Sequence, residues 1–370
     1  MNKKLFGIIL VGLMAVMLGY VGLTAKEVGL FRKYPKPEYL SDEEAESRPV
    51  YGMLSQKEKV VYEALYRGIS NHKEKITLPY DISGSTYSKV YCIIEKQEPE
   101  LFWVDSVYYT AEKIRDAKIV YRADEEETES MKKELEKAVD SVLHYLPDYL
   151  TDYQKIMQIH DSLVNGCRYV ETEDTGYCST AYGCLVRKEA NCEGYAKAFD
   201  LLCSRIGINT VLITGEVEGG ENHAWNQVDV SGKWYNIDVT WDDSDIEGDT
   251  RRAYFLCDDN EFYRNHTPDR EYFEPFVCNS SENNYYNING LYAENVDDAA
   301  EIVMQGLARG DECVEIKFAD DEVYDAFSEK YIKNQKVFEL IEAAGTERWG
   351  EMKVSVRENR QDRCISLYFS

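Results

Sequence analysis

Cys192 stands at the start of a segment that has the pattern of a helix. After Cys192, apolar and aromatic side chains recur at helical spacing, namely Tyr195, Phe199, Leu202 and Ile206. Gly207, which follows them, is a residue that typically ends a helix. The free N–H groups and the dipole at a helix N-terminus favour an anion, which here would be the thiolate. A lone cysteine is more often buried or disulfide-bonded, so Cys192 needs partners before it indicates catalysis.

The segment 223–241 (HAWNQVDVSGKWYNIDVTW) predicts two strands joined at Ser231 and Gly232. If these two residues form the turn, Trp225 lies opposite Asp238 on the partner strand. His223 and Asp238 then lie on the same face as diagonal neighbours, about 7–8 Å apart at the backbone. A three-residue turn would change this face assignment, so the pairing depends on the register.

A thiol at a helix N-terminus and a His–Asp pair on strands suit nucleophilic acyl transfer. We therefore predict a catalytic triad of Cys192, His223 and Asp238, and we expect neither a metal nor another cofactor. Three functions remain open: a peptidase or amidase with water as acyl acceptor, a protein-crosslinking transglutaminase with a lysine amine as acceptor, and a surface module that only binds.

Three short motifs contain these residues: 191–196 (NCEGYA), 223–226 (HAWN) and 238–243 (DVTWDD). In this order they resemble the transglutaminase-like superfamily, especially its bacterial, cysteine peptidase-like domains, and the likeness covers about residues 150–260. The flanks 99–103 (PELFW), 160–161 (HD) and 254–259 (YFLCDD), and then His266, are also similar to anchored bacterial members. The resemblance implies an α+β fold with a papain-like core, in which a helix carrying the cysteine packs on an antiparallel sheet carrying the histidine and the aspartate.

Other polar and aromatic residues near these motifs carry weaker predictions. Trp225, Trp241 and Tyr195 are candidates for the substrate cleft, although core packing explains the tryptophans equally well. His160 lies on the apolar face of its predicted helix, which favours a structural role. The acidic run 242–249 could bind calcium, but it lacks the EF-hand pattern and reads as a solvated loop.

Cysteine count and net charge exclude some sites and partners. The ten cysteines contain no C-x-x-C pair, and Cys178 is close enough in sequence to Cys184 to bridge a loop. A net charge of -26 argues against nucleic acid as a partner. We expect a protein or peptide substrate, and cell-wall peptides belong to this class.

The chain divides into five predicted parts. Residues 1–25 read as a signal anchor, since Lys3 and Lys4 precede an apolar run over 5–23; residues 26–50 read as a linker. We expect a single-pass cell-membrane protein with most of the chain extracellular, or a secreted one if the signal is cleaved. An α+β module (51–125), the catalytic domain (126–283) and a small α/β module (284–370) follow.

Periodicity also predicts individual helices and strands. The predicted helices are 56–70, 125–146, 152–164, 296–309 and one around 323–344. The predicted strands, besides the hairpin, are 90–94, 102–104, 107–109, 119–121, 314–318 and 364–369.

Overall fold

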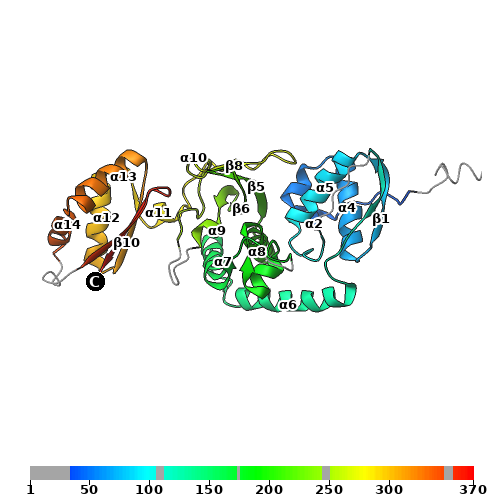
Figure 1. Cartoon of the computed structure of the whole chain (residues 1–370), viewed down its shortest axis with the longest axis horizontal. Helices are drawn as coiled ribbons and strands as arrows, with labels where there is room; N and C mark the ends of the chain where they lie inside the picture. Colours follow the sequence, from blue (N-terminus) through cyan, green and yellow to red (C-terminus); the bar gives the residue numbers. More distant parts are fainter. Residues whose placement is uncertain (1–33, 106–111, 173–175, 244–250, 346–352) are drawn as a thin grey trace, which may run out of the picture. The chain divides into compact units, whose positions relative to one another are not determined.

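The computed structural model describes residues 34–105, 112–172, 176–243, 251–345 and 353–370. These residues form an α+β structure whose helices and strands are drawn in Figure 1. They fall into two compact units. The described part of the smaller unit covers residues 34–40, 54–91, 105 and 112–120. The larger unit takes residues 41–53 and 92–104 together with the described residues from 121 to 370.

The smaller unit pairs one long helix with a two-stranded sheet. Helix α4 (Gln56–Ser70) matches its predicted bounds and begins at a capping box, in which Ser55 and Glu58 satisfy each other's backbone N–H groups. It packs against β1 (Lys75–Ile82), which pairs antiparallel with β2 (Ile114–Lys118). The strand predicted over 90–94 is wrong, because these residues lie in helix α5 (Gly84–Gln97). A short apolar run does not distinguish helix from strand.

A four-stranded antiparallel sheet forms the centre of the larger unit, in the order β7-β6-β5-β8. Its strands are β5 (Thr210–Val217), β6 (Glu221–Val230), β7 (Lys233–Ile237) and β8 (His266–Pro268). Helix α8 (Cys192–Arg205) packs against β5 and β6, and α7 (Asp152–Gly166) packs against α8 (Figure 1). This is the helix-on-sheet core that the resemblance implies.

The β6–β7 hairpin has the predicted register. Val230 pairs with Lys233, so Ser231 and Gly232 form the turn. Both turn residues have positive φ angles, 56° and 85°, as the type I′ hairpin turn requires. The carboxylate of Asp229 accepts the N–H of Gly232 at 2.7 Å, which further fixes this turn.

The last part of the larger unit is a mixed sheet, in the order β11-β12-β10-β9, with helices packed on it. Helix α12 and strand β12 occupy their predicted positions, whereas the helix expected around 323–344 is broken into three pieces. The elements are β9 (Tyr292–Ala293), α12 (Val296–Arg309), β10 (Cys313–Phe318), α13 (Asp321–Phe327), η2 (Ser328–Lys333), α14 (Val337–Ala343), β11 (Val354–Asn359) and β12 (Cys364–Phe369). An apolar core of its own, including Phe318, Phe327 and Leu367, joins these elements.

The remaining elements are short, apart from α6, which agrees with the predicted helix from residue 125. They are α2 (Asp42–Glu46), α3 (Pro49–Met53), α6 (Glu125–Leu143), β3 (Arg168–Tyr169), η1 (Gly183–Arg187), β4 (Glu189–Ala190), α9 (Val239–Asp242), α10 (Asp259–Phe262) and α11 (Tyr285–Ile288). Across the described ranges, no helix has both the length and the apolar character to span a bilayer. The predicted anchor, 1–25, lies outside those ranges.

Candidate active site

Cys192 is the first residue of α8, as predicted. Asn191 caps the helix, and its side-chain oxygen accepts the N–H of Gly194 at 3.2 Å. The N–H of Cys192 has no acceptor within the helix, because the first four N–H groups of any α-helix lack one. This N–H therefore remains available beside the thiol, where an oxyanion would form during attack on a carbonyl.

Gly194 lets the start of α8 approach the preceding loop. A β-carbon at this position would lie 2.1 Å from the carbonyl oxygen of Cys178, a distance that no side chain can occupy. The same carbonyl accepts the N–H of Asn191 at 3.0 Å. The glycine in the motif around the cysteine thus has a packing role: it sets the position of the helix end that carries the thiol.

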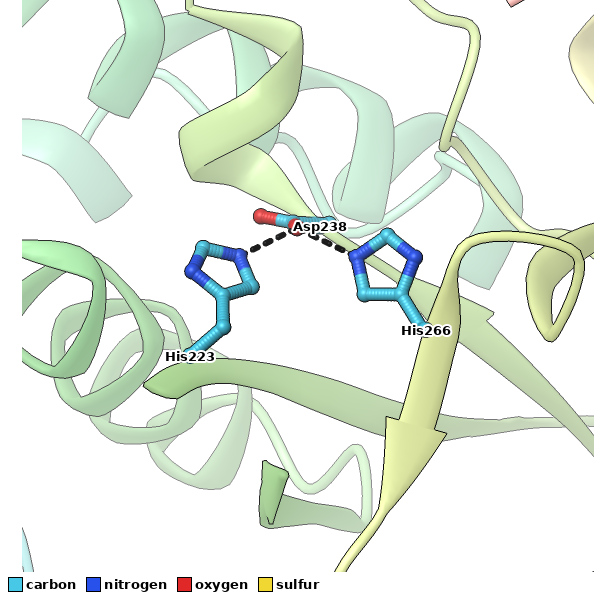
Figure 2. Close-up of side chains that lie close together, drawn as sticks. All are labelled: His223, Asp238 and His266. Carbon is cyan, nitrogen blue, oxygen red and sulfur yellow. Dashed lines mark hydrogen bonds and ion pairs between the residues drawn. The ribbon is translucent and has the colours of Figure 1, made fainter. Parts of the chain in front are cut away.

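His223 connects Cys192 to Asp238. Its Nε2–H donates to Oδ2 of Asp238 at 2.7 Å (Figure 2), and His223 lines the same cavity as Cys192, whose thiol contributes to raising the pKa of the imidazole. Since Nε2 is used by the carboxylate, Nδ1 is the ring atom left for the sulfur. The structure therefore brings the three predicted triad residues together in the order thiol, imidazole, carboxylate.

Asp238 is completely buried and accepts four hydrogen bonds. Oδ1 accepts the backbone N–H groups of Thr240 and Trp241 at 3.0 and 3.1 Å, so this carboxylate also caps the short helix α9. Oδ2 accepts Nε2–H of His223 and, at 3.1 Å, Nε2–H of His266. Four donors on two oxygens hold the carboxylate in a single orientation.

Charge and burial oppose each other at this pair. Burial lowers the pKa of His223, but the attraction of Asp238, their hydrogen bond and the interaction with Cys192 outweigh it and raise this pKa to about 10. Burial likewise raises the pKa of Asp238, yet His223 and His266 more than offset this and hold it below its usual range. The favoured state is a protonated His223 between a carboxylate and the thiol.

Cys192 and His223 line a cavity of about 600 Å³ in the larger unit. Its wall includes Lys96, whose ammonium group lies 2.6 Å from the carboxylate of Glu193 and 3.1 Å from that of Glu95. The remaining lining residues are Asn191, Thr214, Gly215, Glu216, Asn222, Ala224, Thr267, Pro268 and Asp269. A space of this size accommodates a side chain with its adjoining backbone.

The three residues predicted for the substrate cleft are not among the described residues that line this cavity. Trp225 is buried and stacks beside His223, with ring centroids 6.3 Å apart. The ring of Trp241 lies 5.6 Å from His223. Tyr195 is buried in α8, and its hydroxyl donates to Asp243 at 2.5 Å. Trp225 and Tyr195 thus pack in the core, whereas Trp241 is partly exposed, and the cleft role of the three residues stays a prediction.

The prediction of a solvated acidic loop is wrong at its first residue. Asp242 is fully buried; it accepts the backbone N–H of Tyr254 at 3.1 Å and lies 3.2 Å from Nε2 of His160. His160 is itself fully buried, which fits its predicted structural role. The error arises because a carboxylate can be buried once specific donors surround it, and sequence alone does not reveal such donors. Residues 244–250 lie outside the described ranges.

The cysteine-rich segment before α8 does not form the suggested bridge. Cys178, Cys184 and Cys192 are all free thiols, so Cys178 and Cys184 are not joined. The neighbouring Cys184 thiol lowers the pKa of Cys167. Cys192 is therefore available as a nucleophile.

His266 is the site residue whose role the sequence did not predict; it entered only as part of a flanking motif. It reaches Asp238 from β8, which pairs with β5 on the far side from the hairpin. His223, Asp238 and His266 could in principle hold a metal, as their ligand atoms lie within 4.8 Å of one another. However, ligands of a tetrahedral Zn²⁺ are about 3.3 Å apart, whereas the His223–Asp238 distance of 2.7 Å is that of a hydrogen bond.

Comparisons with known proteins agree with this geometry. Residues 144–239 match a family described as the transglutaminase-like superfamily. The chain is similar to the human kyphoscoliosis peptidase, with 30% identity over 132 residues, which are 29% of this chain and 20% of that protein. It thus spans about a fifth of the length of that relative.

Solved structures show a weaker likeness. A structure described as a TGase matches 34% of this chain and 35% of its own with 18% identity and a TM-score of 0.28. A putative cysteine protease from Cytophaga hutchinsonii matches 29% of this chain and 37% of its own, with 20% identity and a TM-score of 0.24. TM-scores this low do not establish a common fold, so the assignment of residues 144–239 to the superfamily depends on the sequence match.

Proposed function

Since the chain carries a transglutaminase-like superfamily domain at residues 144–239, we propose that it is a cysteine acyl-transfer enzyme that acts on amides of proteins or peptides. The observation that carries this proposal is that Cys192 and His223 line one cavity while the imidazole of His223 donates to the buried carboxylate of Asp238. The match to a peptidase over part of its length supports the same reaction class.

The proposed reaction has two steps. The Cys192 thiolate attacks the amide carbonyl and forms an S–C bond, while the N–H of Cys192 stabilises the oxyanion. The C–N bond then breaks, and the leaving amine takes the Nδ1 proton of His223. In the second step Nδ1 accepts a proton from water, whose oxygen attacks the thioester; the S–C bond breaks, and a carboxylic acid leaves. Asp238 keeps Nδ1 directed at the sulfur throughout.

A transglutaminase is the second candidate, and the cavity rim favours it in one respect. Exposed Glu216 and Asp269 line the cavity, and two carboxylates there attract a cationic amine such as a lysine side chain. The amine would resolve the thioester in place of water. Both reactions use the same acylation step, so the acceptor alone separates them.

One experiment tests both candidates. The purified protein is incubated with a peptide pool and a fluorescent primary amine in H₂¹⁸O, and the products are identified by mass spectrometry. A peptidase forms new C-termini that contain ¹⁸O, an amidase forms ¹⁸O-labelled glutamate from glutamine, and a transglutaminase forms amine adducts. We expect labelled acids, and we expect Cys192→Ala to abolish every product.

The control is Cys313→Ala, which removes an exposed cysteine of β10 and should leave the products unchanged. Products that persist in Cys192→Ala would rule out this nucleophile. If the wild-type protein forms none of the three products from the pool, the binding module becomes the better explanation.

We further propose that residues 1–25 anchor the chain in the cell membrane and that the catalytic part acts outside the cell on protein or peptide substrates, cell-wall peptides included. The basic Lys3 and Lys4 before an apolar run support this placement. Protease treatment of intact cells tests it: an external domain is digested without lysis, whereas a chain protected until lysis would contradict the proposal.

A further inference from the structure

His266 contributes both of its ring nitrogens to hydrogen bonds inside the protein. Nε2 lies 3.1 Å from Oδ2 of Asp238 (Figure 2), and Nδ1 lies 2.7 Å from Oδ1 of Asn265. The residue is 1% exposed, so water does not compete for these positions. A neutral imidazole has one donor and one acceptor, which makes the identity of its partners decisive.

The partners of Asn265 determine which way its amide points. Tyr254 lies 2.7 Å from Asp362, and because an ionised carboxylate only accepts, the tyrosine hydroxyl must donate to it. That hydroxyl then accepts from the Asn265 amide N–H at 2.7 Å. The carbonyl oxygen of Asn265 therefore faces Nδ1 of His266, where it can only accept.

Both ring nitrogens of His266 thus face acceptors: an amide oxygen on one side and the Asp238 carboxylate on the other. Only an imidazole that carries two N–H groups satisfies both. A neutral ring would leave a buried lone pair directed at an oxygen, which is costly without water.

Aromatic rings enclose the same imidazole. Its ring centroid is 4.1 Å from that of Phe262, in a stacked arrangement, and the next rings lie at 4.5, 5.1 and 5.4 Å: Trp241, Trp225 and Tyr254. Faces of aromatic rings attract a cation, most strongly when water is excluded. The face of Phe262 stacked on His266 is independent of the hydrogen bonds and favours the same charged form.

We infer that His266 is a positioning residue, a doubly protonated imidazole that holds the triad carboxylate Asp238 in place. The inference rests on the proposed function, because the importance of this carboxylate depends on the triad. The second proton of His266 is required by a chain of hydrogen bonds: its Nδ1 faces Asn265, Asn265 donates to Tyr254, and Tyr254 donates to Asp362. Asp362 lies just before β12, so the C-terminal sheet contributes to the order of the active site.

A cation at His266 also limits how strongly Asp238 holds the proton of His223. Among the described residues, the titratable groups in contact with His266 are Asp238, His223 and Tyr254, and Asp362 lies behind Tyr254; the rings of the two histidines are 5.7 Å apart. With the cation present, the negative charge of Asp238 is shared between two imidazoles. Without it, His223 would hold its proton more tightly and donate it to the leaving amine more slowly.

The first test measures protonation without any substrate. Histidine-selective ¹⁵N labelling of the full chain gives signals for five histidines, and His266→Gln identifies the signal of interest. Because both ring nitrogens of His266 face acceptors, we expect both to carry protons in the folded chain. A singly protonated ring would overturn the inference, whatever the activity of the enzyme proves to be.

Tyr254→Phe is the variant that keeps the ring and removes the hydroxyl. The Asn265 amide can then turn its N–H toward Nδ1, which makes this nitrogen an acceptor, so His266 should carry a single proton while the fold persists. Retention of both protons in this variant would show that the series through Tyr254 does not set the protonation. This readout remains valid if His266→Gln fails to fold.

The second test uses turnover of whichever amide substrate the peptide pool reveals. His266→Gln keeps one N–H donor but no charge; we expect kcat to fall about tenfold and the alkaline limb of kcat to move upward by about 0.5–1 pH unit. KM should be unchanged, because His266 is not among the described residues of the cavity wall. His144→Gln, at an exposed histidine, is the matched control and should change neither quantity.

The outcomes separate the two claims. Loss of kcat without a shift of the alkaline limb would mean that His266 only supports the fold, and would overturn the positioning role. A doubly protonated His266 in a protein that converts no amide would leave the hydrogen-bond assignment intact and refute the proposed function alone.

Discussion

At the scale of single residues, each buried polar group of the site depends on its hydrogen-bond and charge partners. Loss of hydration on burial disfavours the charged form of His223, but the interactions with Asp238 and Cys192 outweigh this effect and raise its pKa. Asp238 tolerates complete burial because four donors surround its two oxygens. The imidazolium therefore persists beside the thiol over the neutral pH range.

This arrangement predicts the reactivity of Cys192 toward alkylating reagents. We expect its alkylation at pH 7 to be fast and the rate to change near pH 10, where His223 loses its proton. His223→Ala should slow the reaction at pH 7 by about tenfold or more, because the stabilising cation is gone. Mass spectrometry of each cysteine over a pH series measures this.

Cys167 serves as an internal control for the same experiment. The neighbouring Cys184 thiol lowers its pKa, so it should also react, but its rate should not depend on His223. Cys203 and Cys257 should react slowly, since burial raises the pKa of each thiol well above its usual value. An unreactive Cys192, or one whose rate is the same in His223→Ala, would contradict a histidine-activated thiolate.

At the scale of elements, the start of α8 and the β6–β7 hairpin position the two reacting groups. The helix end is held by the Asn191 cap and by close contact at Gly194. The hairpin turn at Ser231 and Gly232 sets the register that places Asp238 diagonally from His223. Small displacements of either element would separate the thiol from the imidazole.

Gly194→Ala tests the close contact. The added methyl group would meet the Cys178 carbonyl, so α8 must shift, and we expect a loss of about 1–3 kcal/mol in the free energy of unfolding together with slower Cys192 alkylation. Urea unfolding and alkylation rates measure the two effects.

The matched control is Gly166→Ala at the end of α7, where a β-carbon meets nothing within 4 Å. This variant should be neutral or more stable by up to about 1 kcal/mol. Equal stability of the two variants would remove the packing explanation for Gly194.

At the scale of the whole molecule, the charge state of the site contributes to the stability of the fold. His223 has a pKa of about 10 in the folded chain against an ordinary histidine value of 6.5, so its protonation stabilises the folded chain fully below pH 6.5. This contribution decreases as pH rises from there and is lost once pH passes about 10. His223→Gln removes it at every pH.

We therefore expect the difference in unfolding free energy between the wild type and His223→Gln to decrease between pH 7 and pH 10, by up to a few kcal/mol. Urea unfolding at fixed ionic strength over this range measures it. The exposed His144 provides the control, as His144→Gln should show no such trend. A difference that stays constant with pH would contradict the raised pKa of His223.

The sequence by itself determined the features that depend on near neighbours along the chain. Helical spacing placed Cys192 at a helix start, and a two-residue turn set the pairing of His223 with Asp238. These features are local, because the spacing of side chains along a helix and their alternation along a strand both repeat every few residues. The helices that begin at residues 56, 125 and 152 were predictable for the same reason.

Only the tertiary structure decided which distant groups meet. It buried Asp242 beside His160, turned Tyr195 away from the cavity toward Asp243, and broke the helix expected around 323–344. It also brought His266 to the second side of Asp238 and Tyr254 to Asp362. Such contacts depend on how strands and loops far apart in sequence pack, and burial then selects the hydrogen-bond partners that no local pattern encodes.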